Sequence, residues 1–241
     1  MQDVSGRAAT PKHQQVREYL ESLIEDLEPR AGLPSERDLS QRFGVARMTV
    51  RQAMDALVRS GAVYRVQGAG TFKSPERIDQ PLVLTSFTQD MQARGLRPGS
   101  KTIAQGLEPA TVPVARRLQV EVGAPVIRLE RLRTADDEPM ALERCFLDAK
   151  RVPGLAEEPL GDVSLYATLR ERYGVTLDSA SQTVQATVCD EDEAALLGVE
   201  PGSAAFLFER ISKDARGQVV EYVKSVYRGD RYQLRMALKL P

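Results

Sequence analysis

Three segments in the first quarter of the chain space their apolar residues as amphipathic helices do. Residues 11–27 carry apolar side chains at three- and four-residue intervals, which predicts a helix with one buried face. Residues 35–43 begin at Ser35, a good helix-capping residue, and stop before Gly44, a good helix terminator. Residues 47–60 repeat the helical spacing and stop before Gly61. We therefore predict three short helices in close succession.

A hairpin pattern follows the third helix. Residues 62–66 and 71–73 are short strand-like runs joined by the glycine-rich sequence Gln67-Gly-Ala-Gly. Three helices followed by such a hairpin form the layout of a winged helix-turn-helix, a fold that binds duplex DNA. We assign residues 11–74 to this domain, residues 1–10 to a disordered leader and residues 75–82, which have no helical stripe, to a linker.

The remaining residues, 83–241, mix the two periodicities. Helical spacing occurs in residues 86–93, 114–118, 164–173 and 191–197. Strand-like alternation occurs in residues 100–107, 125–134, 140–148, 176–189, 204–212 and 218–227. Asp136-Asp137 and residues 214–217 have the composition of hairpin turns. The fold class is thus α+β: an N-terminal winged helix-turn-helix joined to a mostly antiparallel sheet domain.

Charge is distributed unevenly in a way that suits DNA. The chain has 241 residues and a net charge of −1, but residues 30–73 hold eight Lys/Arg and three acidic residues. Local positive charge, not total charge, draws a protein to phosphate.

Composition excludes several other classes. No apolar run approaches the roughly 18 residues of a membrane span, and the polar first ten residues lack the apolar core of a signal peptide. The two cysteines, Cys145 and Cys189, have no metal-ligand spacing, and the single histidine is His13. We expect a cytoplasmic protein with no metal, no cofactor and no catalytic residues.

Several motifs resemble those of one bacterial regulator family. Pro34-Ser-Glu-Arg-Asp-Leu, Arg47-Met-Thr-Val-Arg-Gln-Ala and Gln67-Gly-Ala-Gly-Thr-Phe are similar to the DNA-binding domain of GntR-family regulators. Leu84-Thr-Ser-Phe-Thr-Gln-Asp-Met and Ser225-Val-Tyr-Arg-Gly-Asp-Arg-Tyr resemble the effector domain of the HutC subfamily, the chorismate-lyase-like UTRA type. Within this subfamily the resemblance is greatest to amino-sugar regulators of the NagR/DasR type. It implies a homodimer, paired through the effector domains, on a pseudo-palindromic operator.

The resemblance implies that Arg37, Arg47, Arg51 and Gly68 contact DNA. Arg47 and Arg51 are four residues apart and share a helix face, where guanidinium groups can read guanine. To these we add Thr49 as a phosphate contact and Gln67 in the hairpin tip. The alternatives are a solvated basic helix face, an Arg37 that pairs with Glu36 or Asp38, and hairpin glycines that only make the turn. The subfamily commonly has serine where this chain has Ala46, so the third helix loses a capping side chain.

Alternation along the strands predicts an anion site. Arg131 and Arg133 share one strand face, and two guanidiniums about 7 Å apart suit a dianion such as phosphate. Ser164 and Tyr166 open a helix whose free N–H groups also attract phosphate, and Phe87 and Thr88 open another. In NagR-like proteins the matching residues form the phosphate site. The alternative is cross-strand ion pairing of the arginines with Glu143 or Glu130.

The other end of a sugar phosphate requires different groups. Glu143, Glu221 and Tyr227 lie on strand faces where they could bind sugar hydroxyls or an ammonium group. The nearby Arg228 and Asp230 are better explained as an internal pair within a turn.

We therefore predict a transcription regulator, most simply a repressor of amino-sugar genes controlled by glucosamine 6-phosphate or N-acetylglucosamine 6-phosphate. Residues 85–94, beside the linker, are the expected transmitter of the ligand signal. One alternative is the same kind of regulator with a different sugar phosphate or an organic acid. A lyase-like enzyme is a more remote alternative, because no nucleophile motif or metal cluster accompanies the complete DNA-binding module.

Overall fold

The computed structural model describes residues 12–66, 68–75, 77–80, 83–158 and 160–235. The chain divides into two compact units, Met1–Arg77 and Ile78–Pro241. The expected leader, residues 1–10, lies outside the described residues, as does Gln67. Among the helices that are described, none is both long and apolar enough to cross a membrane.

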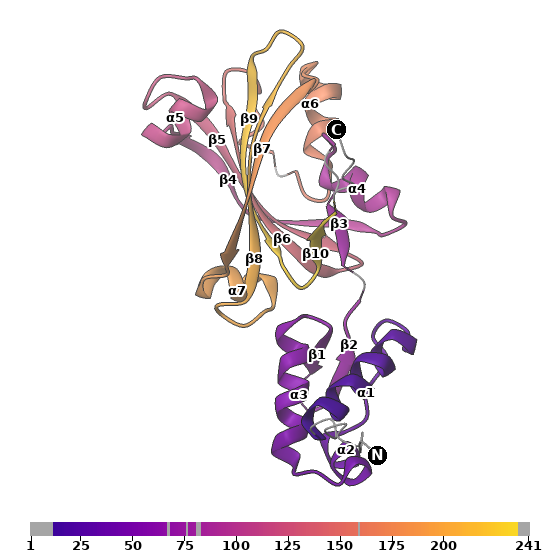
Figure 1. Cartoon of the computed structure of the whole chain (residues 1–241). Coiled ribbons are helices and arrows are strands. Elements are labelled where there is room, and N and C mark those ends of the chain that lie inside the picture. The colour runs from indigo at the N-terminus through magenta and orange to yellow at the C-terminus, as the bar shows by residue number, and fades with distance from the viewer. Residues whose placement is uncertain (1–11, 67, 76, 81–82, 159, 236–241) are drawn as a thin grey trace, which may run out of the picture. The chain divides into compact units, whose positions relative to one another are not determined.

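The described part of the first unit is a small helical bundle with a hairpin (Figure 1). Its elements are α1 (Lys12–Asp26), α2 (Glu36–Phe43), α3 (Arg47–Arg59), β1 (Val63–Val66) and β2 (Gly70–Lys73). One apolar cluster, which includes Leu20, Leu39, Val50 and Met54, joins the three helices to the hairpin. This arrangement is the winged helix-turn-helix that the sequence predicts.

Local chemistry fixes the ends of these helices. The Ser35 hydroxyl accepts a hydrogen bond from the Asp38 backbone N–H, and Gly44 ends α2 in the left-handed region at φ 57°. Ala46 begins α3 without a side-chain cap, as expected. Backbone hydrogen bonds tie the hairpin to the segment before α2, including one of 2.8 Å from the Leu33 N–H to the Thr71 carbonyl. The exposed tip turns at Gly68, whose φ of 76° favours glycine.

An antiparallel sheet dominates the second unit. Its order is β4-β5-β6-β9-β8-β7. The strands are β4 (Pro98–Pro109), β5 (Pro125–Ala135), β6 (Glu138–Asp148), β7 (Ser179–Val188), β8 (Ala204–Lys213) and β9 (Val219–Arg228), and the helices are α4 (Phe87–Ala93), α5 (Val112–Leu118), α6 (Leu165–Tyr173) and α7 (Glu191–Leu197). Asp136 and Asp137 both have positive φ between β5 and β6, as their predicted hairpin turn requires.

Helices pack on both faces of this sheet (Figure 1). On β5, Ile127 and Leu129 pack with α6, and the opposite-facing Val126 and Leu132 pack with α5 and α7. The helix α4 packs on the same face as α6, over Ala141, in the cluster that contains Phe87 and Met91. The side chains between α4 and α6 on this face form the candidate site described below.

Two short strands were not predicted. Residues Ile78–Gln80, inside the expected linker, form β3, which pairs in parallel with β10 (Tyr232–Leu234). Asp79 links this pair to its neighbours: its carboxylate accepts a hydrogen bond from Gln233 at 2.6 Å and pairs with Arg235 at 3.0 Å. The first segment of the second unit is therefore fixed to the end of the described chain.

Candidate functional site

The helix α3 presents an exposed basic surface. Arg47 and Arg51 lie one turn apart near its start and are both exposed, whereas Thr49 is half-buried. Arg37 is exposed on α2, and Gly68 is exposed at the hairpin tip. Arg37, Arg47, Arg51 and Gly68 are thus accessible to a large partner, and Thr49 is partly so.

An ion-pair network, which the sequence did not predict, holds one of these arginines. The Glu36 carboxylate lies 3.2 Å from the Arg51 guanidinium and 3.4 Å from that of Arg65. Arg65 also pairs with Asp55 at 2.6 Å. The network connects α2, α3 and β1, so it orients Arg51 relative to the hairpin.

Arg37 and Arg47 differ from Arg51. Within the described ranges neither forms an ion pair, because Glu36 is engaged by Arg51 and Asp38 accepts a hydrogen bond from the Ser35 hydroxyl at 2.8 Å. The alternative in which Arg37 pairs with a neighbouring acid is therefore not observed. Both guanidiniums are free to meet phosphate or a base edge.

A pocket in the second unit collects every predicted effector residue. It lies on the face of the sheet that carries α4 and α6. Its lining includes Phe87, Thr88, Arg131, Arg133, Glu143, Ser164, Tyr166, Glu221 and Tyr227. Residues from five elements, α4, β5, β6, α6 and β9, therefore meet in one cavity, although what they bind stays a prediction.

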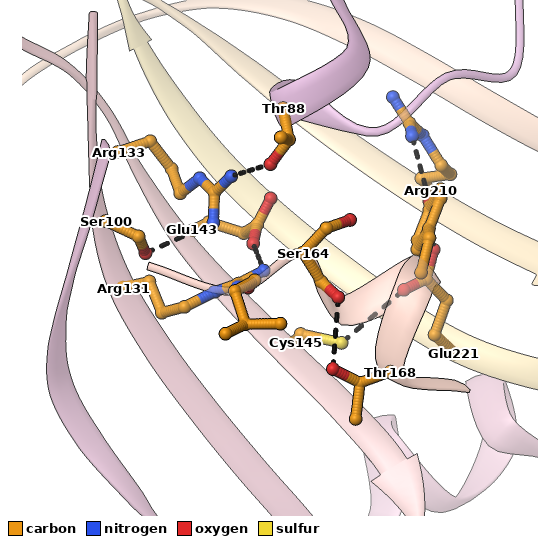
Figure 2. Close-up of polar contacts among 12 residues, drawn as sticks. Thr88, Ser100, Arg131, Arg133, Glu143, Cys145, Ser164, Thr168, Arg210 and Glu221 are labelled. Carbon is orange, nitrogen blue, oxygen red and sulfur yellow. Dashed lines mark hydrogen bonds and ion pairs between the residues drawn. The ribbon is translucent and has the colours of Figure 1, made fainter. Parts of the chain in front are cut away.

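The two arginines of β5 differ in their partners (Figure 2). Arg131 donates to the Glu143 carboxylate at 2.6 Å, which is the cross-strand pair considered as the alternative. In the described part of the chain, Arg133 donates hydrogen bonds to hydroxyls only: to Ser100 at 3.1 Å and to Thr88 at 3.2 Å. It is 2% exposed, and its Nε has no hydrogen-bond partner. Among the described residues no carboxylate forms an ion pair with Arg133, although Glu143 attracts it from beyond ion-pair distance.

These environments shift the pKa values of the charged groups. Burial lowers the pKa of Arg133 from its usual value; the nearby Glu143 carboxylate opposes this shift and the like charge of Arg131 adds to it. Burial acts to raise the pKa of Glu143, but Arg131 and Arg133 more than offset this and hold it below the ordinary value. The carboxylate is therefore ionised at neutral pH and neutralises one of the two guanidiniums, leaving one positive charge unbalanced.

The start of α6 adds donors beside these arginines. The Ser164 hydroxyl accepts from the Ala167 N–H, and the N–H groups of Leu165 and Tyr166 precede the first hydrogen bonds of the helix. Both residues line the pocket. Free N–H groups at a helix start favour anions.

Glu221 is the most enclosed acid of the pocket, at 1% exposure. One carboxylate oxygen accepts from the Tyr166 hydroxyl at 2.7 Å and from Ser212 at 2.8 Å, and the other faces the Cys145 thiol at 3.6 Å. Burial raises its pKa above the ordinary value despite these hydrogen bonds. Burial likewise raises the pKa of Tyr227, to about 12.

The pocket also contains residues that the sequence analysis missed. Arg210 on β8 and Gln182 on β7 line it, with Asp90 from α4. Asp90 pairs with Arg94 at 2.9 Å, and Arg94 also donates to the Asp79 carbonyl in β3.

Outside the pocket, the expected internal pair of Arg228 and Asp230 is confirmed at 2.7 Å.

Together these features define the class of protein: a winged helix-turn-helix unit followed in one chain by a ligand-pocket unit is a DNA-binding transcription regulator. Comparison with known proteins specifies it further. Residues 12–72 match the family of bacterial regulatory proteins called gntR, and residues 93–233 match the UTRA domain. The chain belongs to the GntR family of transcription regulators, in the group with a UTRA domain.

Relatives that match nearly the whole chain are transcription regulators as well. The transcriptional repressor NagR of Bacillus subtilis is 35% identical over 233 residues, which is 95% of this chain and 96% of that protein. The repressor PhnF of Mycolicibacterium smegmatis is 39% identical over 220 residues, 91% of this chain and 89% of PhnF. The crystal structure of PhnF from Mycobacterium smegmatis has a TM-score of 0.66 at 36% identity and covers 94% of this chain and 100% of its own.

These findings confirm the predicted family, fold class and similarity to NagR. They also decide between regulator and enzyme, because the matched relatives are transcription regulators of a non-enzymatic family.

Proposed function

We propose that the chain is a repressor of amino-sugar genes whose operator binding is controlled by a phosphorylated amino sugar, with glucosamine 6-phosphate and N-acetylglucosamine 6-phosphate as the leading candidates. The observation that carries this proposal is the environment of Arg133. Within the described residues its guanidinium donates hydrogen bonds only to hydroxyls and lies over the Phe87 ring at 4.7 Å, and with the free N–H groups of α6 beside it this environment supports an anion as the ligand. The similarity to NagR supports the amino-sugar assignment.

On the DNA side, we propose that a homodimer presents two copies of α3 to a pseudo-palindromic operator. Arg47 and Arg51 would read bases in the major groove, while Arg37 and Thr49 contact the backbone and the Gly68 tip approaches the minor groove. The accessible surfaces of Arg37 and Arg47 support these roles. The Glu36 network supports a fixed direction for Arg51.

Ligand control would run through residues 85–94. Thr88 in α4 contacts Arg133 in the pocket, and Arg94 at the end of the same helix binds β3, the segment that directly follows the DNA-binding unit in the chain. A phosphate that draws Arg133 and Thr88 toward itself would therefore displace a helix attached to β3. Such a ligand shifts the balance between DNA-competent and incompetent states.

A thermal-shift panel tests this function. Hexose 6-phosphates are expected to raise the melting temperature and the same sugars without phosphate are not. A ligand at 100 times its dissociation constant adds about 2.7 kcal/mol, which corresponds to a shift of roughly 5–10 °C for a domain of this size. If organic acids shift the melting temperature and sugar phosphates do not, the alternative ligand class is correct.

A further inference from the structure

The end of the pocket at β8 is built around Arg210. Its Nε donates to the Gln182 side-chain oxygen at 2.7 Å, and its Nη1 donates to the Thr85 carbonyl at 3.3 Å and to the Tyr166 hydroxyl at 3.2 Å. All three partners are neutral. Its Nη2 has no hydrogen-bond partner within the described part of the chain. Arg210 therefore keeps both an unpaired charge and unused donors in the pocket.

The neighbouring acid does not offset this positive charge by contact. Because a guanidinium only donates, Tyr166 accepts from Arg210 and directs its single hydroxyl proton to Glu221. Glu221 also receives the Ser212 hydroxyl and the Cys145 thiol (Figure 2 shows the thiol contact). Burial favours its protonated form. Glu221 is thus surrounded by donors of the protein and is poorly placed to hold an ammonium group.

Glu143, the other pocket acid considered for an ammonium, is bound to Arg131. Strand pairing aligns Arg133 with Ala141, Ala141 with Tyr227 and Tyr227 with Phe206, four residues before Arg210. Three strand spacings and four residues put the Cα atoms of Arg133 and Arg210 about 20 Å apart. Both side chains line the same pocket. Among the described residues, the pocket therefore has cationic groups at two ends, and each carboxylate of its lining (Asp90, Glu143 and Glu221) already accepts from a donor of the protein.

We infer that Arg210 forms a second subsite, which recognises an acyl oxygen on the ligand and disfavours an ammonium. The inference rests on the proposed function, in which the phosphate binds at Arg133. In a 2-substituted hexose 6-phosphate the carbon that bears the phosphate arm and carbon 2 lie on opposite sides of the ring. With the phosphate at Arg133, a 2-acetamido group extends toward Arg210, whose Nη2 donates to the carbonyl oxygen, whereas a 2-ammonium group meets a like charge.

Isothermal titration calorimetry with three hexose 6-phosphates tests this. N-acetylglucosamine 6-phosphate, glucosamine 6-phosphate and glucose 6-phosphate share the phosphate and differ at carbon 2. For the unchanged protein we expect the acetylated sugar to bind roughly 10- to 100-fold more tightly than the amine, the range for one hydrogen bond from a charged donor. In Arg210→Gln that advantage is lost. Arg216→Gln, the same change at an exposed hairpin residue, keeps it.

The outcomes are distinct. Equal binding of the three sugars, tighter binding of the amine, or an acetyl preference that survives in Arg210→Gln overturns the subsite while the proposed function stands. Binding of none of the three overturns the proposed function and the subsite with it. If Arg210→Gln does not fold, the relative affinities of the unchanged protein for the three sugars test the subsite. Arg210→Lys then gives a second reading: it keeps the charge, so it is expected to keep rejecting the amine and to lose part of the acetyl gain.

Discussion

Replacing Arg133 and Arg131 separately by glutamine should change the stability of the fold to different extents. Both side chains are buried in one pocket, at 2% and 3% exposure. Arg133→Gln removes a buried cation that makes no ion pair, and the relief of its desolvation offsets the lost attraction to Glu143, so we expect little change in the free energy of unfolding. Arg131→Gln leaves Glu143 buried without the guanidinium that it contacts at 2.6 Å, and loss of one partner of a buried pair costs about 3–5 kcal/mol.

Both variants should bind the phosphorylated ligand more weakly than the unchanged protein. Loss of the Arg133 donors to a phosphate is worth about 3 kcal/mol, or a dissociation constant roughly 150 times larger. Chemical denaturation gives the stabilities, and calorimetry with N-acetylglucosamine 6-phosphate gives the affinities. Arg97→Gln, in a pair that is 70% and 86% exposed, is the matched control and should change neither. Binding of the ligand by Arg133→Gln within threefold of the unchanged protein, or equal destabilisation of the two variants, would contradict these roles of Arg131 and Arg133.

Three further changes test other parts of the account. Arg47→Gln should weaken binding to the preferred duplex by about 1–3 kcal/mol without lowering the melting temperature, and equal losses on random duplexes would contradict a base contact. Glu36→Gln frees Arg51 and leaves Arg65 paired with Asp55 alone, so anisotropy titrations should find less discrimination between preferred and random duplexes; unchanged discrimination would contradict an orienting role. Burial raises the pKa of Glu221, so on increasing pH the unfolded chain loses the Glu221 proton before the folded protein does. The free energy of unfolding of the unchanged protein should therefore fall as pH rises above 4.5, the ordinary pKa of a glutamate. Glu221→Gln should remove that fall, and parallel pH–stability curves for the two proteins would refute the assignment.

Most elements of the fold could be predicted from local patterns. The helices of the first unit have clear stripes and recognisable ends at Ser35 and Gly44, and the sheet strands are long enough for alternation to be read. The pair β3 and β10 could not be predicted, because each strand has only three residues. Their parallel pairing joins residues about 150 positions apart, as Tyr232 with Ile78 illustrates, and nothing local encodes such a contact.

The candidate pocket could be predicted where the alternation along a strand placed charged residues on a buried face. Arg131 and Arg133 stand out because two buried-strand positions carry charge, and the motif around Thr88 added a second region. Arg210 could not be recognised in the same way. It is a single arginine next to Glu209 on a strand, and nothing in the local sequence distinguishes it from a surface residue. Its role depends on Thr85 and Gln182, which come from distant segments. The contact of Glu36 with Arg51 was missed for the same reason, as it joins two separate helices.

The central claim is that an anion in the pocket controls DNA binding, and one titration tests it most directly. The preferred duplex is first selected from a pool of random sequences with the unchanged protein. The dissociation constant for that duplex is then measured by fluorescence anisotropy at increasing concentrations of N-acetylglucosamine 6-phosphate. The account predicts a change of at least about tenfold, within the usual range of coupling between two sites, and no change with N-acetylglucosamine itself. A dissociation constant that is the same with and without the phosphorylated sugar would contradict it.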